Sequence, residues 1–543
     1  MTADWRVSTK PVSNGCPAAN CAATQSDEGN CVDVPLRSLD VIVILAYLAG
    51  LVAVALCFSR RNTNTEEYFV GNRSFPAWAI GLSMLGTSVS SVTFLAFPAA
   101  AYVLDWRQLV SNLMLPLVAI LAVIVFIPFF RRGQLTSAFE YLEERFNPAV
   151  RLYGTLSFLL LQLIRLGKIL FLVSIPISLL SGVEIHLVIV GLGLFIGFYT
   201  ILGGFDAVIW TDVVQSIVLW FGGLFCFGYI AWHLPDGPGQ IFTIGSEYGK
   251  FHMGPLDWNL TDRTFWTVAL LGIFNWLAMY SSDQNFVQRY AAARSLRAAR
   301  SATVLYTALA IPTWTFFFFL GTCVFVFYRV FPDPGVESLE ADQVFPWFIL
   351  TQIPAGVSGL VIAGVLAAAM SSLDSSINSI ATIVTVDLLR RHLAPLRDDR
   401  YYLRAGRWIA TGAACLMIFG AIVFERLEKE SLNDLSWMIA SVFGGCLLGL
   451  FMIGFFTTRV DSSSAIAGLV VAVVVNIYLG IGVAGWLPAW MTVPMHSYWV
   501  AVVVNLLFVV LAYGVSLRRP QRTAGLAGLT VWTIQREGKT SLV

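Results

Sequence analysis

Hydroxyl side chains follow one face of an apolar segment near the middle of the chain. They recur at the i, i+3 and i+4 spacing of a helix, with a small residue one turn before them: Ala368, Ser371, Ser372, Ser375 and Ser379. Hydroxyl oxygens are hard ligands of the kind that Na+ prefers, by the logic that governs Ca2+ and Mg2+. Asp374 adds a carboxylate to the same stretch. The pattern indicates a helix face that binds a small cation.

A second run of small polar residues lies nearer the N-terminus. Six of the eight positions 86–93 are of this kind, and Pro98 follows: Gly86, Thr87, Ser88, Ser90, Ser91 and Thr93. Such residues weaken a helix, and a break frees backbone carbonyls that a membrane tolerates only around a cavity. Tight helix packing explains any single serine, but six positions together favour a broken helix.

Arg165 lies about midway along another apolar segment, with Lys168 three residues further on. An arginine at the centre of a bilayer costs ~2.5–3.5 kcal/mol on insertion scales. It therefore requires an anionic partner or a water-filled cavity. Two interpretations stay open, a salt bridge to Asp212 and a bidentate clamp on a substrate carboxylate. Asp212 follows the pair Gly203-Gly204, which predicts a tight turn, and its side chain alternatively faces the cytoplasm.

Membrane helices must position these residues. The 543 residues are 57% hydrophobic and 12% charged, whereas soluble globular proteins carry roughly 25% charged residues. This composition disfavours a soluble enzyme and a disordered protein, and the net charge of +1 gives no bulk attraction for nucleic acid. Thirteen apolar segments are long enough for a hydrocarbon core of ~30 Å: 38–58, 76–104, 108–130, 152–181, 184–203, 207–232, 265–287, 302–328, 345–389, 407–424, 435–457, 463–485 and 496–517.

Lysine and arginine are distributed unevenly between the two sides of these segments. Most of the 34 fall inside if the first segment crosses from outside to inside, and the positive-inside rule then sets the orientation. We expect a multi-pass protein of the cell inner (plasma) membrane, with its N-terminus outside and its C-terminus in the cytoplasm. Its parts would be a polar outer tail over 1–36, an additional helix over 37–58, a core over 76–458, two helices over 463–517 and a cytoplasmic tail over 518–543. Cys16, Cys21 and Cys31 in the outer tail either form one disulfide or stay free thiols.

The ten segments after the first form two units of five helices with opposite orientation, and the last two segments follow them. This arrangement is typical of inverted-repeat transporters. The first segment of the second unit, 265–287, carries its own polar patch from Gly272 to Gln284. Both units therefore begin with a polar, interrupted helix, which predicts a central binding site between them.

The chain resembles the sodium:solute symporter family, which includes sodium–glucose cotransporters and bacterial sialic acid transporters. The matching runs follow the family's order over roughly residues 40–460: Glu67–Arg73, Gly203–Gln215, Gln288-Arg289-Tyr290 and Ala367–Leu373. The resemblance implies an all-α integral membrane protein with the LeuT-type five-plus-five inverted-repeat fold and about 13 transmembrane helices. It also implies Na+-coupled symport of a small organic solute by alternating access.

The resemblance further implies where the ligands bind. The Na+ ligands would be the backbone carbonyls of Gly86, Val89 and Ala368 and the hydroxyls of Ser371 and Ser372. Candidates for a second Na+ are Asp212, Asp374 and Ser375. The sialic acid branch of the family places substrate contacts at Ser88, Ser90, Thr93, Asn112, Arg165 and Phe274.

Alternatives to this interpretation stay open. Asn112 and Gln108 depart from the sialic acid members, which leaves other carboxylated sugars and organic acids as substrates. A neutral-monosaccharide symporter is the nearest alternative, although it would not need Arg165. A membrane sensor on the same fold and a channel are alternatives from other classes, whereas no nucleophile–base pair or metal cluster indicates an enzyme. We expect the lipid bilayer and a small anionic solute as partners, without nucleic acid or an obligate protein partner.

Overall fold

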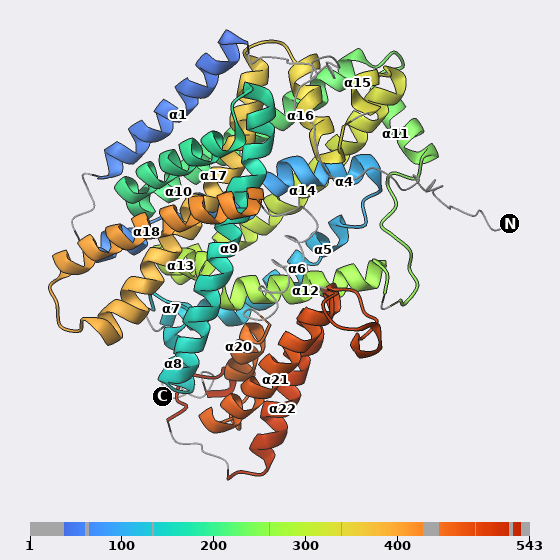
Figure 1. The fold of residues 1–543 in the computed structure, drawn as a ribbon. Coiled ribbons are helices and arrows are strands. Elements are labelled where there is room, and N and C mark those ends of the chain that lie inside the picture. Colours follow the sequence, from blue (N-terminus) through green and yellow to red (C-terminus); the bar gives the residue numbers. More distant parts are fainter. Residues whose placement is uncertain are drawn as a thin grey trace, which may run out of the picture. The chain divides into compact units, whose positions relative to one another are not determined.

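Long apolar helices make up most of the described structure (Figure 1). The computed structural model describes residues 37–59, 64–132, 135–259, 261–337, 339–426, 445–483, 485–520 and 525–533. Within these ranges, ten helices are long and apolar enough to cross a membrane, and one bent pair adds an eleventh candidate. The ten include α1 (Ser38–Ser59), α9 (Pro148–Ser181), α10 (Ile185–His233), α12 (Phe265–Ser282), α14 (Leu296–Val330), α17 (Val357–Ile383), α18 (Asp399–Arg426), α21 (Ser462–Val483) and α22 (Tyr498–Leu517). The tenth runs over Leu109–Arg131 and contains α5 (Leu109–Leu113), α6 (Leu115–Leu121) and most of α7 (Ile127–Arg132).

The bent pair is the interrupted helix predicted from the polar run at 86–93. Helix α3 (Ala77–Ser88) ends where Val89 takes an extended conformation, with φ −92° and ψ 109°. The chain then resumes as a π-helical turn (Val92–Ala96) and α4 (Phe97–Val103). The two halves are bent by 64°, so the predicted break is confirmed.

A matching break begins the second unit. Helix α12 ends at Ser282, Asp283 is extended with φ −82° and ψ 118°, and α13 (Gln284–Ala292) follows. The two break residues, Val89 and Asp283, thus have nearly the same backbone conformation. The inverted-repeat prediction required interrupted helices at corresponding positions, and the structure has them.

The pair Gly203-Gly204 makes the turn that the sequence predicts. Gly204 lies inside the 49-residue α10 with φ 60° and ψ −162°, a conformation that side-chain-bearing residues avoid. A Cβ added at Gly203 would lie 2.2 Å from the Cβ of Ala207. The turn divides α10 into two segments at the place where the sequence separates 184–203 from 207–232.

One predicted segment has different boundaries in the structure. The segment 345–389 is not one span, because α16 (Ala341–Gln352) ends before α17 begins at Val357. Pro354 and Gly356 lie in this interval, and Gly356 has φ 86°, which explains the break. The first part of 435–457 and the tails 1–36 and 534–543 lie outside the described residues, and α20 (Leu447–Phe456) is the described part of that span.

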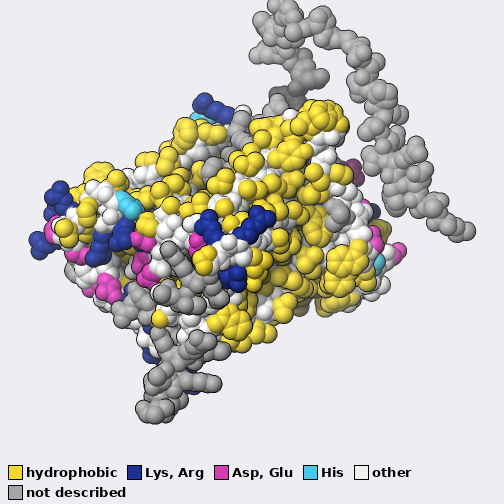
Figure 2. Space-filling model, turned by 90° about the horizontal axis from the view of Figure 1, so that it is seen from below, with side chains coloured by type: hydrophobic (Ala, Val, Ile, Leu, Met, Phe, Trp, Pro, Cys, Tyr) yellow, Lys and Arg dark blue, Asp and Glu magenta, His cyan; other side chains and the backbone are white. Residues whose placement is uncertain are grey.

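Helix α17 is the most enclosed of the long helices. Most of its length is buried, and it packs against α10, α1, α9 and α18. Helices on the outside expose large apolar side chains instead, such as Leu117, Ile124, Val474 and Val510. Figure 2 shows hydrophobic side chains over much of the visible face. A polar α17 inside an apolar shell places the predicted cation-binding face at the centre of a membrane protein.

Candidate functional site: an ion cavity beside a substrate cavity

The hydroxyls of α17 face the break in the first core helix. The Ser371 hydroxyl donates to the carbonyl of Gly86 at 2.8 Å and to the carbonyl of Ala368 at 3.2 Å. Gly86, Val89, Ala368 and Ser371 line one small cavity of about 10 Å³, together with Gln215 and Ser216 of α10. This is about the space that one water-sized particle occupies. Four of the residues predicted to bind Na+ thus line a space of the size of one small particle. The wall of this space is apolar in the structure, and the Ser371 hydroxyl is bonded to the Gly86 carbonyl.

Ser372 takes a different position from the other predicted Na+ ligands. Its side chain is fully buried, and its hydroxyl donates to the carbonyl of Thr87 at 3.1 Å. Ser372 is not among the residues that line the small cavity. Four of the five predicted Na+ ligands therefore share one cavity wall, and the fifth contacts the backbone between Gly86 and Val89.

A larger cavity of about 600 Å³ lies beside the two helix breaks. Its volume falls within the ~300–1,000 Å³ usual for small-molecule sites. Of the predicted substrate contacts, Ser90, Asn112 and Arg165 line it. Other polar residues of its wall, which the sequence did not assign to the substrate, are Ser111, Gln162, Lys168, Asn275, Ser282 and Asp283.

Arg165 is available to a ligand of this cavity. Its guanidinium donates one hydrogen bond, to the Thr87 carbonyl at 3.3 Å. Neither Arg165 nor Asp283 takes part in an ion pair within the described ranges. The salt bridge considered between Arg165 and Asp212 is wrong, because another arginine holds that carboxylate.

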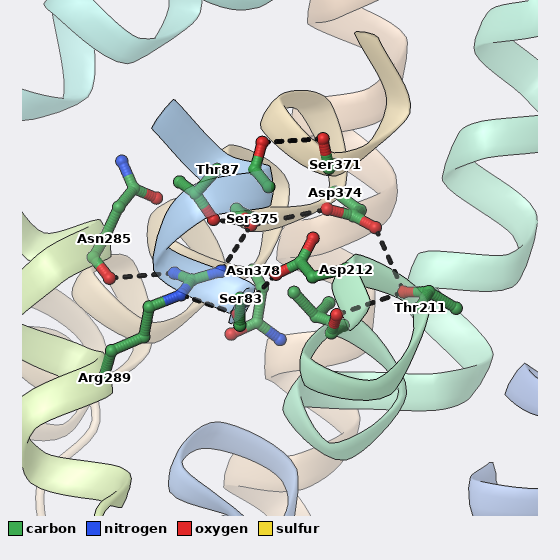
Figure 3. A network of polar contacts seen from close by, with 12 residues as sticks. Ser83, Thr87, Thr211, Asp212, Asn285, Arg289, Ser371, Asp374, Ser375 and Asn378 are labelled. Atoms are coloured by element: carbon green, nitrogen blue, oxygen red, sulfur yellow. Dashed lines mark hydrogen bonds and ion pairs between the residues drawn. The ribbon is translucent and has the colours of Figure 1, made fainter. Parts of the chain in front are cut away.

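That arginine is Arg289, which follows the predicted segment 265–287 and is therefore expected in a connecting region at the inner surface. It instead lies in α13 with no exposed surface and donates to Asp212 at 2.8 Å. Its guanidinium also donates to Ser83 and Ser375, each at 2.8 Å (Figure 3). The sequence does not reveal that the chain continues after the break at Asp283 as the buried helix α13. This is why Arg289 looks like a loop residue.

Two of the three candidates for a second Na+, Asp212 and Ser375, accept hydrogen bonds from this guanidinium, and Asp374 is joined to them through Ser375. Asp374 accepts a hydrogen bond from Tyr199 at 2.8 Å. It accepts another from Ser375 at 3.4 Å (Figure 3). Asp212 and Asp374 are both fully buried, so the alternative in which Asp212 faces the cytoplasm is wrong. The network holds two carboxylates and one guanidinium, and buried charge of this kind requires compensation.

The remaining predicted contacts lie away from the large cavity. Ser88 donates to the carbonyl of Leu85 at 3.0 Å, and Thr93 is buried in the helix that follows the break. Phe274 precedes Asn275, which does line the cavity, but is not itself part of the wall. Asp283 and Asn275 belong to the polar patch at 272–284 that the sequence singled out, and Gln162 lies one turn before Arg165. The polar patch and the spacing from Arg165 are therefore the sequence features from which these three residues could have been predicted.

Comparison with known proteins agrees with this geometry. The family model described as "Sodium:solute symporter family" matches residues 68–472. The chain belongs to this family. It is 31% identical to the sodium/sialic acid symporter NanT of Aliivibrio fischeri over 80% of this chain and 86% of the relative. It is also 31% identical to the sodium/sialic acid symporter SiaT of Proteus mirabilis, over 80% and 88%.

One solved structure resembles this chain over nearly the whole length of the solved chain. It is a substrate-bound, outward-open state of a Na+-coupled sialic acid symporter, with a TM-score of 0.81 and 28% identity. The match covers 89% of this chain and 99% of that one. The protein is thus a multi-pass, Na+-coupled symporter with the inverted-repeat fold, and not an enzyme.

Proposed function

We propose that this symporter imports a carboxylated sugar of the sialic acid type together with Na+. The observation that carries the proposal is Arg165, whose guanidinium lines a 600 Å³ cavity without an ion pair in the described structure. A guanidinium binds a carboxylate with two parallel charge-assisted hydrogen bonds. A neutral monosaccharide offers no such group, and the guanidinium would then have no carboxylate acceptor for its paired N–H groups.

The relatives support an anionic substrate. Two relatives with 31% identity are named for sialic acid, and the mouse sodium-coupled monocarboxylate transporter 1 is 30% identical over 77% of this chain. The polar wall of the cavity favours the sugar over a simple monocarboxylate. Asn112, Gln162 and Asn275 provide amide groups for hydroxyl and acylamino groups of a sugar acid.

Na+ would bind at the small cavity through the carbonyls of Gly86, Val89 and Ala368 and the Ser371 hydroxyl. The hydroxyl of the neighbouring Ser372, which does not line the cavity in this structure, would complete the set of ligands. This position joins α17 to the break in the first core helix, so Na+ would stabilise the substrate cavity next to it. A second Na+ would use Asp212, Asp374 and Ser375 and would share two of them with Arg289. Counting Na+ ions per transported substrate decides between one and two.

The transport cycle follows from these two sites. Na+ and substrate bind from outside, the core rearranges, and both leave to the cytoplasm, with the N-terminus outside as the charge distribution indicates. Because binding free energies are linked, Na+ and substrate raise each other's affinity by the same factor. The Na+ gradient and a membrane potential worth about 2.3 kcal/mol per charge per 100 mV supply the driving force.

Uptake into proteoliposomes tests the proposal. We expect an inward Na+ gradient to accumulate N-acetylneuraminate above equilibrium, with less accumulation of uronic acids and none of glucose. Arg165→Gln should abolish this uptake and leave thermal unfolding close to that of the wild type. Uptake by Arg165→Gln at wild-type affinity would contradict the carboxylate clamp. Saturable accumulation also separates a transporter from a channel or a sensor.

A further inference from the structure

One backbone carbonyl is shared by the two sites. The Thr87 oxygen accepts from the Ser372 hydroxyl at 3.1 Å and from the Arg165 guanidinium at 3.3 Å. Ser372 belongs to the proposed Na+ ligands, and Arg165 to the proposed carboxylate clamp. The two donors come from different helices, α17 and α9, so this oxygen connects them through a third.

The position of Thr87 explains why its carbonyl can serve two donors. Thr87 lies in the last turn of α3, one residue before the helix ends at Ser88. Carbonyls in the last turn of a helix lack their intrahelical donors, and the extended Val89 prevents the chain from supplying them. An acceptor freed by the break is thereby directed toward both ligand sites.

We propose that the Thr87 carbonyl transmits Na+ binding to the substrate arginine. A serine hydroxyl can rotate, but Na+ bound to its oxygen fixes the direction of the O–H bond. That bond then points to the Thr87 carbonyl and holds it where it orients Arg165 toward the cavity. Ser372 is in this role a positioning residue for Arg165. The inference rests on the proposed function, since it assumes that Na+ and a carboxylate occupy the two cavities.

Ser371 provides a matched control on the same helix. It is as deeply buried as Ser372 and is also a proposed Na+ ligand. Its hydroxyl, however, donates to Gly86 and Ala368, and Arg165 contacts neither of these carbonyls. Both serines should therefore affect Na+ affinity, but only Ser372 should affect how strongly Na+ acts on the substrate.

The measurement is the coupling factor, defined as the Kd of N-acetylneuraminate without Na+ divided by its Kd at saturating Na+. Titration calorimetry on the full-length protein gives both values. We expect Ser371→Ala to require more Na+ but to reach the wild-type coupling factor. Ser372→Ala should lose about fivefold to tenfold of that factor even at saturating Na+, the effect of one hydrogen bond. Ser372→Thr keeps the hydroxyl and should restore it.

The outcomes separate this inference from the proposed function. A wild-type protein whose binding of N-acetylneuraminate does not respond to Na+ would contradict the proposed function. If Na+ does tighten binding but both alanine variants keep, or equally lose, the coupling factor, then only the role of Thr87 is wrong. Should Ser372→Ala not fold, Ser372→Cys nearly preserves volume but provides only a weak donor, so it must show the same loss.

Discussion

Arg165 and Asp283, two of the three charged residues at the substrate cavity, have opposite signs and come from different repeats; the third is Lys168. Arg165 lies on α9, and Asp283 lies at the break between α12 and α13. They are electrostatic neighbours without a direct ion pair in the described structure. Asp283 thus lowers the positive potential that a substrate carboxylate meets. Its other role is structural, because its carboxylate accepts from the Asn285 N–H at 2.8 Å and caps α13.

Asp283→Asn separates these two roles. Asparagine is as good an N-cap as aspartate, so the break and the unfolding temperature should stay close to those of the wild type. Without the opposing carboxylate, N-acetylneuraminate should bind severalfold more tightly at saturating Na+, as calorimetry would measure. Asp333→Asn is the control, because Asp333 also accepts a backbone N–H but lies outside the cavity. Weaker binding by Asp283→Asn would show instead that the carboxylate accepts hydrogen bonds from the substrate.

At the scale of elements, the sequence predicts the first helix break because the signal is local. Six small polar residues in eight positions weaken a helix wherever they occur. The turn at Gly204 is predictable for the same reason, since only glycine adopts its φ of 60° readily. The second break was visible only as a polar patch, and its position at Asp283 depends on the capping of α13.

Other parts of the site depend on tertiary contacts that no local pattern reveals. Arg289 follows the seventh apolar segment and looks like a loop residue, but nine consecutive residues of α13 are buried. Arg289 pairs with Asp212, which lies 77 residues earlier. Asp212 is therefore not the ion-pair partner of Arg165 that the sequence suggested. Likewise, spacing alone placed Ser371 and Ser372 on one face but did not distinguish their acceptors, which the bend at Val89 determines.

Helix α1 contributes a cap to α17. Asp40 is buried in α1, and its carboxylate accepts from the N–H groups of Gly356 and Gly359 and from the Ser358 hydroxyl, at 2.6, 2.9 and 2.7 Å. Asp40→Ala would leave these buried donors without their acceptor, so we expect a loss of about 1–3 kcal/mol in stability. Thermal unfolding in detergent measures it. Asp40→Asn keeps the accepting oxygen and should lose less; equal unfolding temperatures for all three proteins would refute the cap.

Lys250 holds the end of α4 that lies away from the break. Its ammonium donates to the carbonyls of Tyr102 and Leu104, at 2.6 and 3.2 Å, and lies over the ring of Phe325. Burial lowers the pKa of Lys250 to about 8, below its value of ~10.4 in an unfolded chain. Between these values the unfolded chain binds more protons, so the contribution of this group to stability rises with pH from about 8 to about 10.4.

The direction of this pH dependence can be measured by comparison with a variant that has no titratable group at position 250. Wild type and Lys250→Gln are unfolded thermally at pH 7.5 and pH 9.5. The wild type should gain stability relative to Lys250→Gln at the higher pH. A difference between the two proteins that does not change with pH would mean that Lys250 keeps its proton over this range.

At the scale of the whole molecule, alternating access requires a route from the ion site to the cytoplasm. The polar face of α17 continues past Ser375 through Asn378 and Thr382, both buried. Thr385, a further turn along, lines a separate cavity of about 410 Å³ with Arg73 and Arg390, on the side that the charge distribution assigns to the cytoplasm. Along this face, the Gln288 amide nitrogen lies within hydrogen-bond distance of the Phe69 carbonyl, Asn378 and Thr382, at 2.6, 2.8 and 3.0 Å.

If Na+ leaves along this face, a thiol placed on it should react with a thiophilic monovalent cation. Thr382→Cys and Thr313→Cys are a matched pair, since both threonines are fully buried and bond to a carbonyl four residues earlier. Thr313 lies on α14, away from the route. In chloride-free, inside-out vesicles, Ag+ should inhibit N-acetylneuraminate transport faster in Thr382→Cys than in Thr313→Cys or the wild type. Na+ should slow this inhibition by competition. Equal rates in the two variants would show that Na+ leaves elsewhere, since both thiols would then be equally remote from its path.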